Sequence, residues 1–127
     1  MRLFLVRHAE AAPGEPDDLR PLTPAGRDAA RALGAKLAAE EAEVVLSSPL
    51  LRARETAAAI AEAAGLEAMP DERLAPGATA DDVRGAAAGR GETVVAVGHQ
   101  PDCSEIVLAL TGDSVDFAPG AYHEVEL

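Results

Sequence analysis

Three short apolar runs, each bounded by polar or turn-forming residues, constrain the fold of this chain most strongly. They cover residues 3–6, 44–46 and 94–97 and consist almost entirely of aliphatic side chains. Runs of this length predict strands that are buried on both faces, as in a parallel sheet. Helical patterns separate the runs, and parallel neighbours need such crossovers. We therefore expect an α/β fold, a three-layer α/β/α sandwich with a mostly parallel sheet.

Start and stop signals predict four helices between the strands. A capping residue followed by proline begins the first two, at Thr23 and Ser48, and weaker signals begin two more at Thr79 and Pro101. Glycine ends the second and fourth helices, at Gly65 and Gly112. A weak strand near residues 67–69 and an alternating segment at 121–127, read as a half-exposed edge strand, complete the order βαβαβαβαβ.

The charge balance excludes two classes of partner. The chain has 127 residues, with 22 acidic against 11 basic side chains and a formal net charge of −11. Three aromatic residues and no basic face are a poor match for nucleic-acid binding. An anionic membrane surface would be repelled as well. The length predicts one domain over residues 1–127, and nothing in the sequence indicates its oligomeric state.

Cysteine usage and the N-terminal residues predict a cytoplasmic protein. The single cysteine, Cys103, cannot form an intrachain disulfide, and the run at 3–6 is too short for a signal-peptide core or a membrane span. We expect Cys103 to be a core residue, although its place in the first turn of a helix also allows a reactive thiol of lowered pKa. No metal is predicted, because His8 and His99 lack a carboxylate at ligand spacing.

Histidine and arginine residues follow the predicted strands at the point where each strand ends. The first strand leads to Arg7 and His8, the second to a segment that contains Arg52, and the fourth to His99. Ligands of such sheets bind beyond the carboxyl ends of the strands, so these side chains should converge. A neutral imidazole can attack phosphorus while guanidinium groups hold the phosphoryl oxygens. The pattern favours phosphoryl transfer.

Four motifs carry a resemblance to a known family. They are Leu5-Val6-Arg7-His8-Ala9-Glu10, Pro21-Leu22-Thr23-Pro24-Ala25-Gly26, Ser48-Pro49-Leu50-Leu51-Arg52-Ala53 with Thr56-Ala57, and Val97-Gly98-His99-Gln100-Pro101. In this order they resemble the histidine phosphatase (phosphoglycerate mutase-like) superfamily over residues 2 to about 111. The short chain and the Arg20-Pro21-Leu22-Thr23 segment resemble its SixA-type phosphohistidine phosphatase branch.

The resemblance implies a role for each matching position. His8 would be the nucleophile that becomes phosphorylated, and Arg7, Arg52 and His99 would complete the phosphate pocket. Water would then regenerate the enzyme without a metal or an organic cofactor. Arg20 is either a further phosphate contact or a residue that only orders the acidic loop through Asp17 or Asp18. For Arg52 the alternative is a solvated helix residue.

The family's proton donor has no clear counterpart in this chain. Larger members supply a carboxylate from an insertion before the second-histidine strand, and the matching position here is Arg73. Glu72, Asp81 and Asp82 are the neighbouring acids that would have to substitute. A missing acid impairs hydrolysis of an alkyl phosphate, which expels a poor alkoxide, more than that of a phosphohistidine, whose protonated imidazole leaves readily.

The leading hypothesis is therefore a phosphatase that hydrolyses phosphohistidine on a protein through a phospho-His8 intermediate. The first alternative is a phosphatase of the same superfamily that acts on small phosphorylated molecules. The second is a phosphate-binding module without catalysis, which the presence of both His8 and His99 opposes.

Overall fold

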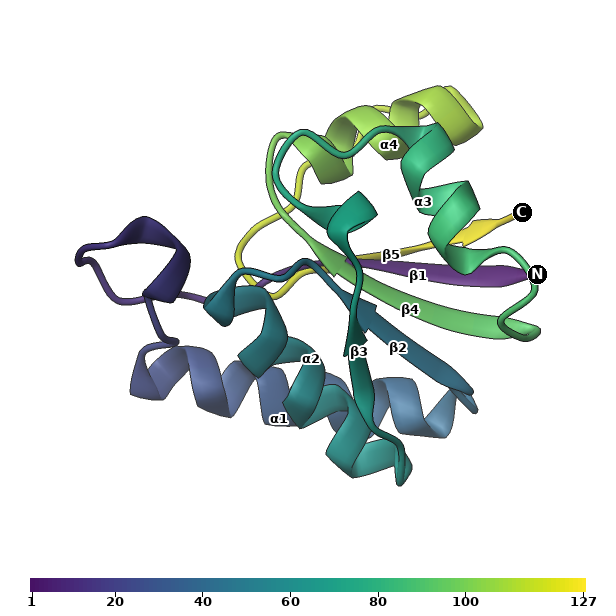
Figure 1. Cartoon of the computed structure of the whole chain (residues 1–127). Helices are drawn as coiled ribbons and strands as arrows, with labels where there is room; N and C mark the ends of the chain where they lie inside the picture. The colour runs from purple at the N-terminus through teal and green to yellow at the C-terminus, as the bar shows by residue number, and fades with distance from the viewer.

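Five strands form one sheet in the order β3-β2-β4-β1-β5 in the computed structural model, which describes all residues 1–127 (Figure 1). The strands are β1 (Arg2–Arg7), β2 (Val44–Ser47), β3 (Ala68–Pro70), β4 (Thr93–Gly98) and β5 (Tyr122–Glu126). All neighbours are parallel except β5, which runs antiparallel to β1 at the sheet edge. The expected element order and sheet are confirmed, including the edge strand.

Helices cover both faces of this sheet. They are α1 (Pro24–Ala39), α2 (Leu51–Ala64), α3 (Ala80–Ala87) and α4 (Asp102–Thr111), with 3-10 turns η1 (Asp17–Leu19) and η2 (Glu72–Leu74). Helices α1 and α2 pack on one face, and α3 and α4 on the other (Figure 1). The three-layer sandwich is confirmed. No helix is both long and apolar enough to cross a membrane.

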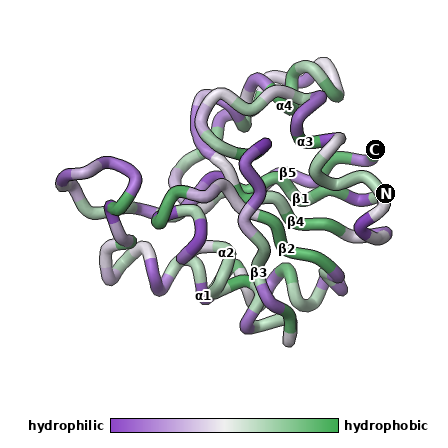
Figure 2. The backbone as a smooth tube through the Cα atoms, viewed as in Figure 1, coloured by the Kyte–Doolittle hydropathy of each residue, from purple (hydrophilic) through white to green (hydrophobic).

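The strands are apolar throughout because each one faces a helical layer on both sides. Along β1, Leu3 and Leu5 belong to the core under α3 and α4, whereas Phe4 and Val6 belong to the core under α1 and α2. Figure 2 shows the central strands as the most hydrophobic part of the chain. This alternation explains why the sequence shows continuous apolar runs rather than a period of two.

The structure confirms the predicted helix starts at Thr23 and Thr79 but not the one at Ser48. The Thr23 side chain accepts a hydrogen bond from the Gly26 amide at the start of α1. Helix α2, in contrast, begins at Leu51, and Leu50 occupies its N-cap position without a side-chain cap. The Ser48 hydroxyl accepts from the Leu50 amide in a short turn before the helix, so the expected start at Ser48 was wrong.

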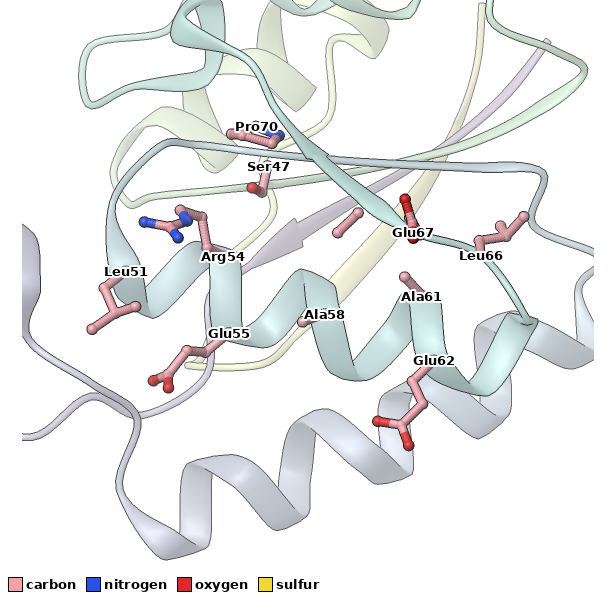
Figure 3. Close-up of a pocket in the computed structure, with 11 residues that line it drawn as sticks. Ser47, Leu51, Arg54, Glu55, Ala58, Ala61, Glu62, Leu66, Glu67 and Pro70 are labelled. Carbon is pink, nitrogen blue, oxygen red and sulfur yellow. The ribbon is translucent and has the colours of Figure 1, made fainter.

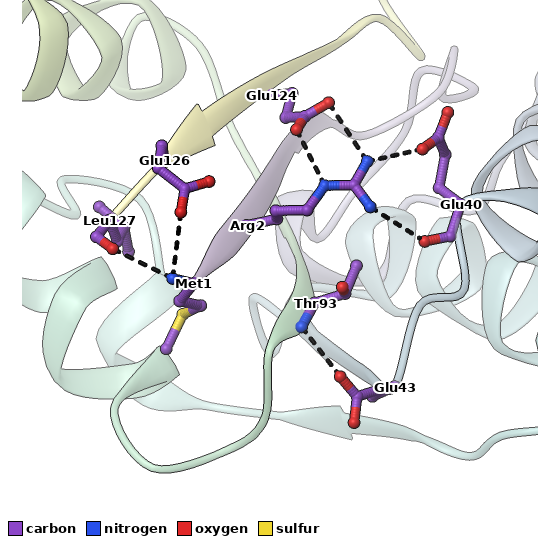
Figure 4. A network of polar contacts seen from close by, with 8 residues as sticks. All are labelled: Met1, Arg2, Glu40, Glu43, Thr93, Glu124, Glu126 and Leu127. Carbon is purple, nitrogen blue, oxygen red and sulfur yellow. Dashed lines mark hydrogen bonds and ion pairs between the residues drawn. The ribbon is translucent and has the colours of Figure 1, made fainter.

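Polar contacts close the end of the sheet where the parallel strands begin (Figure 4). Arg2 binds the carboxylates of Glu124 and Glu40 at 3.0 and 2.6 Å. A carboxylate oxygen of Glu43 accepts hydrogen bonds from the amides of Glu92 and Thr93. The opposite end, where β1, β2 and β4 terminate, is left for the site.

The loop between β1 and α1 projects from the molecule and is closed at its neck (Figure 1). Ala11 and Leu22 form an antiparallel bridge, and the Thr23 amide donates to the Glu10 carbonyl at 3.0 Å. Gly26 permits this closure, because a Cβ atom at that position would overlap the Glu10 carbonyl oxygen. The loop carries η1 toward the beginning of α2.

Candidate active site

His8 follows β1 directly and is held by its own backbone neighbours. Its amide donates to the Gly98 carbonyl at 3.0 Å, and its Nδ1 atom lies 2.8 Å from the Ala9 carbonyl oxygen. A carbonyl can only accept, so Nδ1 carries the proton and the Nε2 lone pair is free. Burial lowers the pKa of His8, and the positive charge of nearby Arg52 lowers it further. The neutral, nucleophilic form therefore predominates at pH 7.

His99 follows β4 and is more deeply buried than His8. Its Nε2 atom lies 2.7 Å from the Oγ atom of Ser48, and only 5% of the residue is exposed. Burial, the neighbouring His8 and Arg52 together lower the pKa of His99 to about 4. The Nδ1 atom of His99 has no hydrogen-bond partner, which leaves it available to a ligand.

The two imidazole rings face each other edge to face. Their centroids are 5.3 Å apart at an interplanar angle of 61°. The strand ends at Arg7 and Gly98 are paired in register, which explains how residues 8 and 99 come together. The structure therefore brings together the two histidines that sequence reasoning placed at one rim.

Arg7 ends β1 beneath this histidine pair. One terminal nitrogen donates to the Phe117 carbonyl oxygen at 2.9 Å. Its Nε atom is buried and has no hydrogen-bond partner. A buried guanidinium N–H without a partner is costly, and an anion bound beside it would satisfy it.

Arg52 points away from solvent in the first turn of α2. It is 8% exposed, so the alternative of a solvated helix residue is wrong. Its two terminal nitrogens donate to the Asp17 carbonyl at 2.8 Å and to the Asp17 carboxylate at 3.3 Å. The hydroxyl of Thr56 donates to the Arg52 carbonyl and accepts from the Ala9 amide, which ties α2 to the segment after His8.

Arg20 orders the projecting loop, as one of the two interpretations expected. Its Nε atom donates to the Ala12 carbonyl at 2.8 Å, and a terminal nitrogen binds the Asp17 carboxylate at 3.0 Å. Its charge also contributes to the lowered pKa of His8, so Arg20 lies within electrostatic reach of the histidines. A direct phosphate contact from Arg20 stays a prediction.

Two residues of this constellation were not singled out as site residues. Asp17 bridges Arg52 and Arg20, and Ser48 contacts His99. Ser48 opens one of the four motifs and was predicted to cap a helix, but neither pattern indicates a contact with His99. The sequence predicts Asp17 only as a partner through which Arg20 orders the loop, and no local pattern shows that η1 meets α2.

The neighbouring acids considered as proton donors lie elsewhere. Glu72 and Asp81 are exposed and accept no hydrogen bond from another side chain. Asp82 accepts from the Thr79 amide and hydroxyl in a capping box at the start of α3. None of the three contacts either histidine. Arg73, at the position of the expected acid, binds the Asp71 carboxylate.

Cys103 is a core residue, as expected. It is fully buried, and burial raises the pKa of its thiol to about 12. The alternative of a reactive thiol with a lowered pKa was wrong, because desolvation outweighs any benefit of its place in the first turn of α4.

The largest groove of the molecule is lined by neither histidine (Figure 3). It is a groove of about 630 Å³ between α2 and β3. Ser47 and Pro70 border one end, and Arg54 reaches along its wall. The candidate site is therefore identified by the charges and the free ring nitrogen around His8, and not by the volume of this groove.

The assembled groups suit a tetrahedral anion. A free imidazole nitrogen on His8 faces a setting that Arg7 and Arg52 make locally cationic, although the chain as a whole carries a charge of −11. Guanidinium groups and a second imidazole can hold phosphoryl oxygens while the first imidazole attacks phosphorus. No group of three or more His, Cys, Asp or Glu side chains has the arrangement of a metal site.

Comparisons with known proteins agree with this geometry. Residues 3–76 match the model of the family described as histidine phosphatase superfamily (branch 1). A structure of the protein histidine phosphatase SixA complexed with tungstate superposes with a TM-score of 0.85 at 27% identity, covering 100% of this chain and 88% of that one.

Two further relatives are informative. A structure described as "putative phosphohistidine phosphatase SixA from Agrobacterium tumefaciens" has a TM-score of 0.81 at 27% identity, covering 97% of this chain and 88% of that one. A protein of Hydrogenobacter thermophilus described as "putative phosphoserine phosphatase 2" is 36% identical over 78 residues. That match covers 58% of this chain and 38% of the relative, well under half of its length.

Proposed function

Because the chain belongs to the histidine phosphatase superfamily (branch 1), we propose that it is a metal-independent phosphatase that hydrolyses phosphohistidine on a protein through a phospho-His8 intermediate. In this proposal His8 is the nucleophile, and Arg7, Arg52 and His99 hold the phosphoryl group. Arg20 adds charge at the edge of the pocket.

One observation carries the proposal. The 2.8 Å hydrogen bond from Nδ1 of His8 to the Ala9 carbonyl fixes the tautomer with a lone pair on Nε2. Burial and nearby arginines keep that ring neutral by lowering its pKa. A histidine that is oriented, neutral and surrounded by cations is a nucleophile for an anionic phosphoryl group.

The first step transfers the phosphoryl group to His8. Its Nε2 lone pair forms a bond to phosphorus, and the bond from phosphorus to the substrate nitrogen breaks, with its electron pair returning to that nitrogen. Arg7 and Arg52 stabilise the charge on the phosphoryl oxygens in the transition state. His99 contributes through its free Nδ1 atom, and the bound dianion would raise the pKa of this ring from its value of about 4.

The second step returns the enzyme to its starting state. A water oxygen bonds to phosphorus, the phosphorus–Nε2 bond breaks, and its electron pair becomes the His8 lone pair again. The proton lost by water passes to solvent or to the phosphate product. The proton on Nδ1 stays with the ring throughout, held by the Ala9 carbonyl.

The choice of phosphohistidine as substrate rests on two supports. One is the similarity at 27% identity to a protein histidine phosphatase across the whole chain. The other is chemical: Glu72, Asp81 and Asp82, the acids expected to protonate an alkoxide, form no hydrogen bond with either histidine. A protonated imidazole needs no such donor.

A phosphatase for small phosphomonoesters is the second candidate. The similarity to the Hydrogenobacter protein described as a putative phosphoserine phosphatase favours it, although that match covers only part of both chains. Rates for a phosphohistidine-bearing protein against a panel of sugar, glycerate and aryl phosphates separate the two. Rapid turnover of the esters without turnover of phosphohistidine would overturn the leading proposal.

We also infer that residues 1–127 act as one domain in a reducing, cytoplasmic compartment. The single cysteine, buried and with a raised thiol pKa, suits such a compartment. Subcellular fractionation followed by immunodetection tests this inference.

A covalent-intermediate experiment tests the mechanism. Protein quenched during turnover should carry an acid-labile phosphoryl group, and His8→Ala should carry none and lose activity. His123→Gln, in β5 away from the site, is the matched control and should retain both. Activity should persist in a metal chelator. A His8→Ala variant that still turns over substrate would exclude the intermediate, and a wild type that binds phosphate without turnover would indicate a binding module.

A further inference from the structure

The carboxylate of Asp17 occupies a position that the proposed mechanism leaves unused. It lies on η1 and binds Arg52 at 3.3 Å and Arg20 at 3.0 Å. Its backbone carbonyl accepts a second hydrogen bond from Arg52 at 2.8 Å. Asp17 thus joins the projecting loop to a guanidinium group of the phosphate pocket.

Asp17 is charged and accessible. Hydrogen bonding to Arg20 and the charge of Arg52 lower the pKa of its carboxyl, so the group is ionised at neutral pH. Its side chain is 65% exposed, which leaves oxygen lone pairs open to an incoming ligand. The charge of Asp17 also acts on His99 by opposing the lowering of its pKa, which places the carboxylate within electrostatic reach of the histidine pair.

An ionised carboxylate beside the arginines is a poor proton donor for an alkoxide. It is, however, a good hydrogen-bond acceptor for a cation. The imidazole ring of a phosphohistidine is such a cation while its second nitrogen is protonated and the phosphorus–nitrogen bond is intact. The anionic or neutral leaving groups of glycerate, sugar and aryl phosphates offer no comparable charge.

We propose that Asp17 is a specificity-determining residue that selects phosphohistidine by accepting a hydrogen bond from the second ring nitrogen of the leaving imidazole. This inference rests on the proposed function. The phosphorus–nitrogen bond breaks and its electron pair stays on the departing nitrogen, while the proton on the other nitrogen remains on the ring. Imidazole therefore leaves neutral, and no proton donor is consumed.

The neighbouring residue provides a matched control. Asp18 lies on the same 3-10 turn, is exposed, and has no ion pair or side-chain hydrogen bond. Asp17→Asn keeps an oxygen that can accept from Arg52 but removes the charge. Asp17→Glu keeps the charge on a longer side chain. Asp18→Asn removes the same charge from the loop without touching the pocket.

The test compares kcat/KM for a phosphohistidine-bearing protein with kcat/KM for an aryl phosphate. In Asp17→Asn the ratio of the two should fall by about tenfold or more, the size of effect of one charge-assisted hydrogen bond. Asp17→Glu should recover most of the ratio, and Asp18→Asn should match wild type on both substrates. A ratio that is unchanged in Asp17→Asn would overturn the proposal.

Measuring the binding of inorganic phosphate distinguishes a role of Asp17 in substrate specificity from a purely structural role. Titration followed by 31P NMR should show Asp17→Asn binding phosphate at least as tightly as wild type, because a competing carboxylate has been removed. Loss of phosphate binding together with equal losses on both substrates would show that Asp17 only supports the pocket, and would overturn the proposal. A wild type that turns over aryl phosphate but no phosphohistidine is a separate result, because it refutes the proposed function itself.

Discussion

The Nε2 atom of His99 and the Oγ atom of Ser48 lie 2.7 Å apart although 51 residues separate them in the chain. The adjacent strands β2 and β4 create this contact, since the Ser48 amide donates to the Val97 carbonyl at 2.9 Å. Both side chains are buried. Ser48 therefore orients the ring of His99 and leaves its Nδ1 atom without a hydrogen-bond partner.

Ser48→Ala should lower kcat by about fivefold with little change in KM, because a buried hydrogen bond of roughly 1 kcal/mol that positions His99 is lost. Steady-state kinetics with an aryl phosphate measures this effect. Ser114→Ala, at an exposed position, is the control and should behave as wild type. A Ser48→Ala variant with unchanged kcat would show that the contact does not orient the ring for catalysis.

Arg52→Ala should reduce kcat/KM by about a hundredfold or more, since in the proposed mechanism its buried charge holds a phosphoryl oxygen, a contact worth roughly 3 kcal/mol or above. Arg54, two residues along α2, is exposed and has no ion pair. Arg54→Ala should therefore stay within about twofold of wild type, as expected of surface substitutions. Equal losses in the two variants would contradict the assignment of Arg52 to the pocket.

The ring of His8 should titrate below the ordinary histidine value of 6.5, because burial and the nearby arginines lower its pKa. The neutral nucleophile is present above the folded pKa and is lost as the pH falls through it. Activity on an aryl phosphate should therefore survive as the pH drops past 6.5. NMR titration of the ring gives the midpoint directly, and a midpoint at or above 6.5 would contradict this prediction.

His99 should make the fold sensitive to acid. Its pKa is about 4 in the folded chain against an ordinary 6.5, so its unfolded form binds the proton first. This contribution to stability is intact above pH 6.5 and is lost as the pH falls toward 4. By this linkage the free energy of unfolding should drop by about 2 kcal/mol more between pH 7.5 and 4.5 in wild type than in His99→Gln.

Urea denaturation at the two pH values measures that difference. Other carboxylates titrate in the same range, and the comparison of wild type with His99→Gln cancels their contribution. An identical acid sensitivity in the two proteins would show that His99 is not desolvated in the folded state.

Gly26→Ala should destabilise the protein by about 2–4 kcal/mol, because the new Cβ atom would overlap the Glu10 carbonyl oxygen where the loop neck meets α1. Gly85→Ala, inside α3, meets only the flexible side chain of Arg73. It should raise stability by up to about 1 kcal/mol through helix propensity. Thermal unfolding of both variants checks the pair, and similar behaviour would contradict the close approach at Gly26.

Local patterns predicted the layers, the strand order along the chain and the helix starts at Thr23, Thr79 and Pro101, because apolar periodicity and capping act within a few residues. Ser48 shows where such reasoning fails. A serine followed by proline is a good helix-start signal. In the structure, however, the Ser48 hydroxyl accepts a hydrogen bond from the Leu50 amide and contacts Nε2 of His99. Helix α2 begins only at Leu51. A partner 51 residues away decided the outcome.

Residue types and their order along the chain were enough to predict what ends each strand and, because the strands run parallel, that His8, Arg52 and His99 would meet at one rim. That conclusion needs only the direction of the strands. The contacts of those side chains emerge only in the folded chain: Ser48 contacts His99, the Ala9 carbonyl contacts His8, and Asp17 bridges Arg52 and Arg20. Hydrogen-bond and ion-pair partners depend on distances of a few ångströms between segments, and a loop such as the one carrying η1 has no periodicity that predicts where it packs.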